Sequence, residues 1–118
     1  MLAPEANVRV WLCTEPTDMR KSFDGLSALV RNRLGEDPLS GHLYCFINRR
    51  RTQMRILYFD RSGYAMWAKR LERGHFVTGR ARSADALKRA LSFAELQCLL
   101  EGIEVTDARK YKRFSLGS

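Results

Sequence analysis

The 118-residue sequence lacks long hydrophobic runs, because charged or polar residues interrupt every apolar stretch after a few positions. A helix that crosses a bilayer needs roughly 20 consecutive, predominantly apolar residues, so we expect no membrane-spanning helix. The first residues also lack the basic region and apolar core that mark a signal peptide. Together these absences predict a cytoplasmic protein that has no membrane partner.

Cysteine and histidine are scarce as well. The three cysteines form no CxxC pair, and Cys13 and Cys45 lie in apolar segments typical of strands, while Cys98 lies in an expected helix. An odd number of cysteines in such places is typical of small buried side chains in a reducing compartment. His42 and His75 are too isolated to complete a zinc site with them. We therefore expect no metal and no cofactor.

Signatures of common catalytic sites are also missing. The sequence has no HxxxH pair, no nucleophile elbow and no glycine-rich phosphate loop. Carboxylates near the ends of expected elements are Asp18, Asp24, Asp60 and Glu72, and their spacing matches no metal-nuclease signature. A helix cap, a helix face and a turn account for the three aspartates. We predict that the protein is not an enzyme; a metal-dependent nuclease built around Asp18 and Asp60 is a third alternative.

Acidic residues are few relative to basic ones, with 13 Asp and Glu against 21 Lys and Arg and a formal net charge of +8. Residues 1–40 carry five basic and six acidic residues, whereas residues 41–118 carry sixteen and seven, a net charge of +9. Arginine dominates, and its planar guanidinium suits phosphate and carboxylate. This distribution favours a polyanionic partner over the alternative of simple solubility.

The apolar pattern predicts strands with turn residues between them. The expected strands span 8–13, 42–48, 53–60, 64–70 and 75–79. Apolar residues at helical spacing from Met19 to Leu34 predict one helix, which Gly35 ends. The capping box "SFAE" at 92–95 begins a second helix, whereas residues 80–91 fit either a helix or a strand.

These elements predict an α+β fold. We expect a mostly antiparallel sheet of four to five strands, with a meander over 42–70 and two packed helices. One domain spans 1–106, and residues 107–118 form a basic C-terminal tail that is partly ordered.

Basic residues gather in the connection after the strand 42–48, at the end of the strand 64–70 and in the tail. A two-stranded ribbon can enter the major groove of DNA, and basic residues between aromatic ones suit bases and phosphates. Protection of a sheet edge and ion pairing with Glu72 are the alternatives. The predicted nucleic-acid-binding residues are Arg49, Arg50, Arg51, Arg55, Lys69, Arg70, Arg73, Arg109, Lys110, Lys112 and Arg113.

Four stretches of the chain resemble a known family. They are "TDMRKSFDGL" (17–26), "SGHLYCFINRRR" (40–51), "ILYFDRSGYAMWAKRLERGHF" (56–76) and "LLEGIEV" (99–105). In this order and spacing they resemble the TnpB accessory proteins, the second open-reading-frame products of the insertion-sequence sixty-six group of bacterial transposons. The resemblance departs after Gly79, where the family has a polar, proline-containing link.

The resemblance implies a helper that acts beside a DDE-type transposase and to which no catalytic residues are attributed. With the charge pattern, it predicts a non-enzymatic accessory factor for DNA transposition that binds element DNA through the arginine-rich hairpin and assists the transposase. The alternative is a protein–protein adaptor whose arginines meet an acidic surface of the transposase. Asp18, Arg20 and Lys21 are candidate partner-binding residues.

Overall fold

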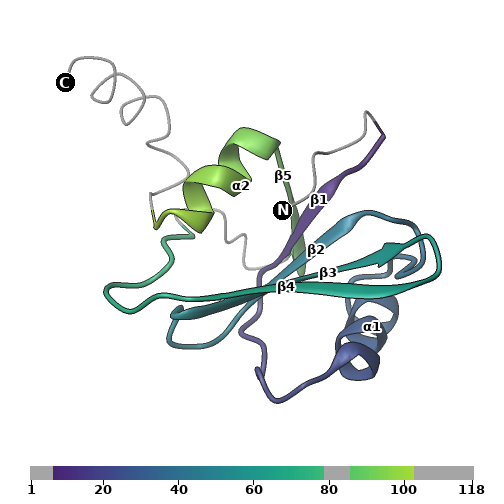
Figure 1. The fold of residues 1–118 in the computed structure, drawn as a ribbon, viewed down its shortest axis with the longest axis horizontal. Helices are drawn as coiled ribbons and strands as arrows, with labels where there is room; N and C mark the ends of the chain where they lie inside the picture. Colours follow the sequence, from purple (N-terminus) through teal and green to yellow (C-terminus); the bar gives the residue numbers. More distant parts are fainter. Residues whose placement is uncertain (1–6, 79–85, 103–118) are drawn as a thin grey trace.

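The described residues form one five-stranded sheet with a helix on each face (Figure 1). This computed structural model describes residues 7–78 and 86–102. The strands are β1 (Val10–Cys13), β2 (Leu43–Ile47), β3 (Gln53–Asp60), β4 (Gly63–Arg70) and β5 (Lys88–Leu91), and the helices are α1 (Phe23–Asn32) and α2 (Phe93–Leu100). The strand order is β4-β3-β2-β1-β5, and only the β1–β2 pair is parallel. The predicted α+β class, the meander and the two helices are confirmed.

Each face of the sheet has its own core, because successive side chains of a strand point to opposite sides. On one face Tyr44 and Leu57 pack with Leu26 of α1, and on the other Ile56 packs with Leu96 of α2. All five residues of β2 are buried, so this central strand is covered on both sides. Coverage of both faces explains why its sequence is continuously apolar instead of alternating.

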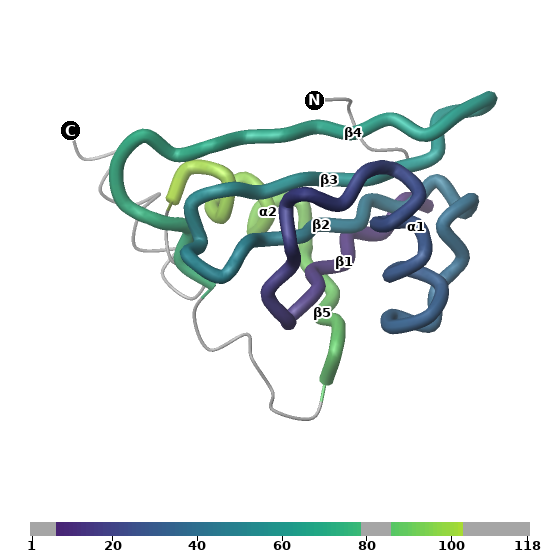
Figure 2. Tube along the Cα trace, turned by 90° about the horizontal axis from the view of Figure 1, so that it is seen from below, coloured from purple at the N-terminus to yellow at the C-terminus, as the bar shows by residue number. Residues whose placement is uncertain are grey.

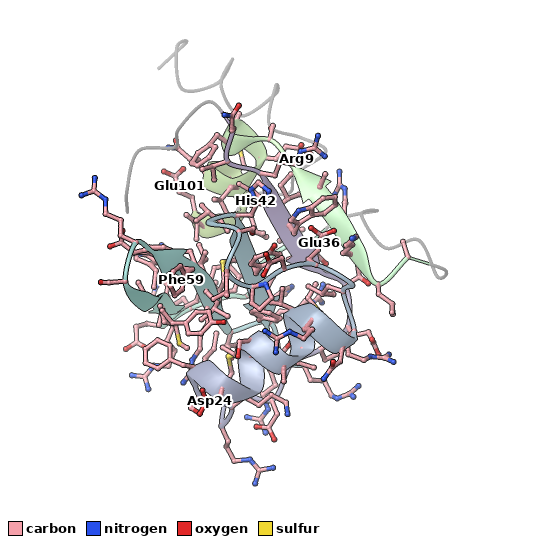
Figure 3. All side chains as sticks on the ribbon, turned by 90° about the vertical axis from the view of Figure 1, so that its right-hand side faces the viewer. Arg9, Asp24, Glu36, His42, Phe59 and Glu101 are labelled. Atoms are coloured by element: carbon pink, nitrogen blue, oxygen red, sulfur yellow. The ribbon has the colours of Figure 1, made fainter. Side chains whose placement is uncertain are left out.

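Figure 3 views the sheet from the end that is on the right in Figure 1. Asp24, in the first turn of α1, lies below the sheet, and Glu101, just beyond α2, lies above it. The two helices therefore enclose the sheet from opposite sides.

The fifth strand expected at 75–79 is wrong. Residues 75–78 are not in a strand, and residue 79 lies outside the described residues. The segment is apolar because Phe76 is packed in the core, where its side chain is fully buried. The backbone N–H of Phe76 donates to the carbonyl of Arg51 at 2.6 Å. The fifth strand is β5, which pairs antiparallel with β1, so the strand interpretation of 88–91 is correct. Residues 80–85 and the tail at 107–118 lie outside the described residues.

The two helices differ in how well their starts were predicted. In α2 the capping box is present, with the Glu95 N–H donating to Ser92 Oγ at 3.0 Å and the Ser92 N–H donating to Glu95 Oε1 at 2.9 Å. Helix α1 begins at Phe23 with Ser22 at its N-cap position, about one turn after the first residue of the apolar spacing, and Met19 packs against the core from the turn before it. The apolar spacing continued across that turn, which made the helix look longer.

The three cysteines are free and buried. Burial raises the pKa of the Cys45 thiol to about 12 and also raises the pKa of Cys13. Both thiols are protonated at neutral pH and are poor nucleophiles. Neither described helix has the length and apolar character needed to cross a membrane.

Candidate nucleic-acid interface

The turn after β2 and the loop after β4 meet at the end of the sheet that is on the left of Figure 1, and the segment before α1, which runs below the sheet, is hydrogen-bonded to the last residue of β2. The turn 48–52 joins β2 to β3, and the loop 71–76 follows β4 beside it (Figure 2). The Leu71 N–H donates to the Thr52 carbonyl at 2.8 Å, and the Thr17 N–H donates to the Ile47 carbonyl at 2.9 Å. We call the turn 48–52, the loop 71–76, the segment 17–21 and the adjoining residues Arg55 and Arg70 the arginine end.

The turn 48–52 is held in one shape by Asn48. The side-chain Oδ1 of Asn48 accepts the N–H of Thr52 at 2.8 Å and that of Gln53 at 3.0 Å. Its Nδ2 donates to Thr52 Oγ1 at 3.1 Å, and its carbonyl accepts the Arg51 N–H at 3.0 Å. Arg51 occupies the left-handed region with φ of 59°. Asn48 therefore organises the backbone that carries three consecutive arginines.

Replacing Asn48 tests this organisation. We expect Asn48→Ala to lower the free energy of unfolding by about 1–3 kcal/mol, because two half-buried backbone N–H groups lose their acceptor. Asn48→Asp is the matched control, since a carboxylate keeps both acceptor positions. Urea denaturation followed by circular dichroism measures the difference. Equal loss in both variants would contradict this role of the Oδ1 atom.

Cationic side chains outnumber carboxylates at the arginine end. The two carboxylates are those of Asp18 and Glu72. The eight cations are Arg20, Lys21, Arg49, Arg50, Arg51, Arg55, Arg70 and Arg73. An excess of positive charge at one end of the sheet favours the approach of a polyanion.

Both carboxylates are engaged in surface ion pairs. Arg20 and Asp18 form a two-pronged contact with a shortest distance of 2.7 Å, and Arg70 lies 3.5 Å from Glu72. The Arg70 and Glu72 side chains are 68% and 79% exposed, and a pair in that setting contributes little. Within 7–78 and 86–102, no carboxylate lies within 4.0 Å of the other six cations. Most of the charge at the arginine end is thus available to a partner.

The Asp18 contact predicts a response to acid. The hydrogen bond from the Arg20 side chain is the main reason that the pKa of Asp18 is lowered from 3.8 to about 2. A lowered folded-state pKa stabilises the structure above pH 3.8, and this contribution is lost as the pH falls through about 2. We expect the Asp18 carboxyl resonance to titrate near pH 2 in NMR. In an Arg20→Gln variant the midpoint should be higher but should stay below the ordinary 3.8, because the backbone N–H of residue 20 still donates to the carboxylate. A wild-type midpoint near pH 4 would show that the contact does not form in solution.

An open depression of about 390 Å³ lies over the ends of β3 and β4. The pairs Gln53–Arg70 and Arg55–Ala68 are cross-strand neighbours there, and Arg55 also donates to the Lys21 carbonyl at 2.8 Å. Ala68 is exposed and adds no bulk, so space remains between the two arginine positions. Gln53 and Ala68 were not anticipated as site residues; strand alternation was the signal that could have placed them beside Arg55 and Arg70.

Lys69 also lines the depression, but its ammonium group has a partner within the chain. It is on the face covered by α2, where its Nζ donates to the Leu100 carbonyl at 2.8 Å. A cation at a helix C-terminus stabilises the exposed carbonyls and the dipole, so this position has a structural explanation. The predicted tail residues Arg109, Lys110, Lys112 and Arg113 lie outside the described residues.

The aspartates of the nuclease alternative are also separated. Asp18 belongs to the arginine end, whereas Asp60 is at the far end of β3, seven residues beyond Gln53. At about 3.3 Å per residue the strand alone spans roughly 20 Å. In the part of the chain that the structure describes, no three His, Cys, Asp or Glu side chains gather to hold a metal.

Comparison with known proteins gives a family match. A family model described as "IS66 Orf2 like protein" matches residues 8–110. The relative "Uncharacterized protein y4hO" of Sinorhizobium fredii is 39% identical over 104 residues, which is 88% of each chain. A second protein of that organism, "Uncharacterized protein y4jC", is 36% identical over 77 residues, 65% of this chain and 66% of its own. No solved structure matches the chain.

Proposed function

The chain belongs to the IS66 Orf2-like protein family, and from this membership we propose that it is a non-enzymatic accessory factor of insertion-sequence transposition. It binds DNA of its own element through the arginine end and assists the transposase of that element. The observation that supports this proposal is the convergence of three cationic segments on one end of the sheet, where two carboxylates face eight cations.

Duplex DNA is the polyanion that this surface suits best. Its phosphates place one negative charge about every 1.7 Å along the axis, so several guanidinium groups can be satisfied together. The turn 48–52 projects from a two-stranded ribbon, a shape that enters the major groove. Arg55 and Arg70 flank the depression beside it, where a backbone phosphate can lie between them.

A salt titration tests DNA binding. Fluorescence anisotropy of a labelled element-end duplex is measured between roughly 50 and 300 mM salt, and about six phosphate contacts give a slope of log K against log salt near −5. A duplex of unrelated sequence is the matched probe for specificity. Absence of binding at the lowest salt overturns the proposal that the arginine end meets DNA.

The adaptor alternative uses the same chemistry, because the guanidinium fork binds carboxylates as well as phosphates. It is distinguished by a pull-down with the purified transposase of the same element in nuclease-treated buffer. Retention of the transposase without any DNA binding favours the adaptor, and DNA binding in the titration favours the proposed function.

A further inference from the structure

Strand β4 is an unusually open edge. It spans eight residues and pairs along its whole length with β3, without a bulge, from Gln53–Arg70 to Asp60–Gly63. Among the described residues no strand pairs with its outer side. Its first six residues, Gly63 to Ala68, carry no charge and no proline. Natural proteins protect such edges with charges, prolines, bulges or short strands, and β4 has none of these over that stretch.

The opposite edge shows the contrast. Strand β5 has only four residues, and two of them are charged. Lys88 is ion-paired with Glu36, and Arg89 with Glu95 at 3.1 Å. This edge is protected in the usual way, so the open character of β4 is specific to one side of the sheet.

The pairing pattern shows which backbone groups of β4 are free. The Asp60–Gly63 pair encloses a two-residue loop, so it is a hydrogen-bonded pair, and bonded pairs then alternate along the ladder. The hydrogen bond from the Leu71 N–H to the Thr52 carbonyl continues this alternation. It follows that Tyr64, Met66 and Ala68 direct their N–H and C=O groups away from β3.

We propose that β4 pairs antiparallel with β4 of a second copy of this chain, about a two-fold axis at Met66. If the two-fold axis is perpendicular to the sheet, the α1 faces of both copies lie on the same side of the joint sheet. Even-numbered residues of β4 then lie opposite even-numbered residues of the partner strand, and odd-numbered opposite odd-numbered ones. In this register Tyr64 lies opposite the partner's Ala68, and Trp67 lies opposite the partner's Ala65. Each large aromatic side chain therefore has a small residue across from it.

Charge placement favours the same partner. Lys69 and Arg70 follow the uncharged stretch. Antiparallel pairing therefore puts these two cations of one copy at one end of the joint ladder and those of the other copy at the opposite end. Each Lys69 lies opposite the partner's Gly63, and each Arg70 lies opposite the partner's Ser62. Like charges stay far apart, and a glycine leaves room for the lysine. Parallel pairing of two copies instead sets these cations beside each other, which is unfavourable.

The side chains of the strand also gain from this pairing. Tyr64 and Met66 contact the core on the α1 side only in part, and Trp67 does so on the α2 side. All three are half-exposed in the single chain. A neighbouring strand covers them on both faces and completes the backbone hydrogen bonds of the edge.

The dimer deepens the proposed function, and this consequence rests on it. The two arginine ends lie at opposite ends of the joint sheet, because antiparallel pairing reverses the direction of the second β4. One dimer then presents two DNA-binding surfaces that face apart, and it can hold two duplex segments at once.

Oligomeric state is measured first, without DNA. Light scattering after size exclusion is expected to give twice the 13.6 kDa of one chain at about 100 µM. Met66→Pro removes an N–H that points away from β3, so the β3 ladder keeps its bonds while the edge loses the two cross-copy bonds at the two-fold axis. We expect a monomer with an unchanged circular dichroism spectrum. A monomeric wild type, or a variant that remains dimeric, overturns the proposal.

A cysteine variant tests the register independently of proline. In Met66→Cys, the two introduced thiols face each other with Cα atoms about 5.5 Å apart, a separation that a disulfide spans. We expect mild oxidation to give a covalent dimer, since the three native cysteines are buried. Ser62→Cys is the control: its two copies lie about 26 Å apart along the strands. Failure of Met66→Cys to cross-link, or equal cross-linking of both variants, overturns the Met66 register.

These measurements separate the two proposals. Met66→Pro, which lies outside the depression, is assayed for DNA affinity as a monomer. A slope of log K against log salt equal to that of wild type supports DNA binding by each arginine end alone. A variant that becomes monomeric and still binds DNA supports both the β4 interface and DNA binding by a single chain. A dimer that binds no DNA refutes the proposed function and leaves the interface in place.

Discussion

The triple variant Arg49→Ala, Arg50→Ala and Arg51→Asn is expected to bind element DNA several hundred-fold more weakly at about 0.1 M salt. Each phosphate contact contributes about 0.9 to the slope of log K against log salt, so three lost contacts flatten the slope by about 2.7. Asn replaces Arg51 because φ there is 59°, a conformation that asparagine tolerates better than alanine. Fluorescence anisotropy over the same salt range measures both quantities.

The matched control removes the same charge elsewhere. Arg9→Ala, Arg31→Ala and Arg61→Asn alter exposed arginines outside the arginine end, and none of them has a carboxylate within 4.0 Å in the described residues. Arg61 has φ of 54° and therefore also takes asparagine. Arg9 lies beside His42 on the end of the sheet that faces the viewer in Figure 3.

We expect the control to lose only a few-fold in affinity, from the weaker long-range field. Equal losses in the two triple variants would show that net charge alone attracts DNA. An unchanged affinity in the Arg49–Arg51 variant would refute the contact itself.

Local patterns predicted the hairpins correctly. The strands β2, β3 and β4 follow one another with short turns, so their order and direction are determined by neighbouring sequence alone. In the expected meander over 42–70 the third strand runs back toward the first turn, and the pairing of Gln53 with Arg70 shows that β4 does so. This is why the convergence of two basic segments could be foreseen.

Pairings between distant segments were not predictable in the same way. Strand β1 lies between β2 and β5, and one of these pairings is parallel and the other antiparallel. Nothing in the local sequence encodes a neighbour 30 or more residues away. The segment 17–21 reaches the arginine end through the Thr17 to Ile47 hydrogen bond, a contact that no periodicity indicated.

The face of the sheet to which each cationic side chain points depends on the strand register. Lys69 and Arg70 are adjacent in sequence and both line the depression, yet the Lys69 Nζ donates to the Leu100 carbonyl at the end of α2, whereas Arg70 is paired with Glu72. A strand alternates its side chains, so a basic cluster within a strand is divided between two faces. Treating residues 69–73 as one group ignored this division.

Phe76→Ala is expected to lower the free energy of unfolding by about 3–5 kcal/mol, a large part of the roughly 5–15 kcal/mol typical of a domain. Phe76 is fully buried in the core on the α2 side, and its N–H holds the loop 71–76 to the Arg51 carbonyl. The variant leaves a cavity and loosens the attachment of that loop to the turn 48–52. Guanidinium denaturation followed by tryptophan fluorescence measures the loss.

Two controls show whether the loss comes from packing. His75→Ala alters the exposed neighbour and should change the unfolding free energy by less than about 0.5 kcal/mol. Phe76→Leu keeps most of the buried volume and should lose less than the alanine variant. If Phe76→Ala unfolds at nearly the wild-type denaturant concentration, the residue is not a core anchor. The attachment of the loop 71–76, which carries Arg73, to the turn 48–52 would then lack its physical basis, because it depends on this buried ring.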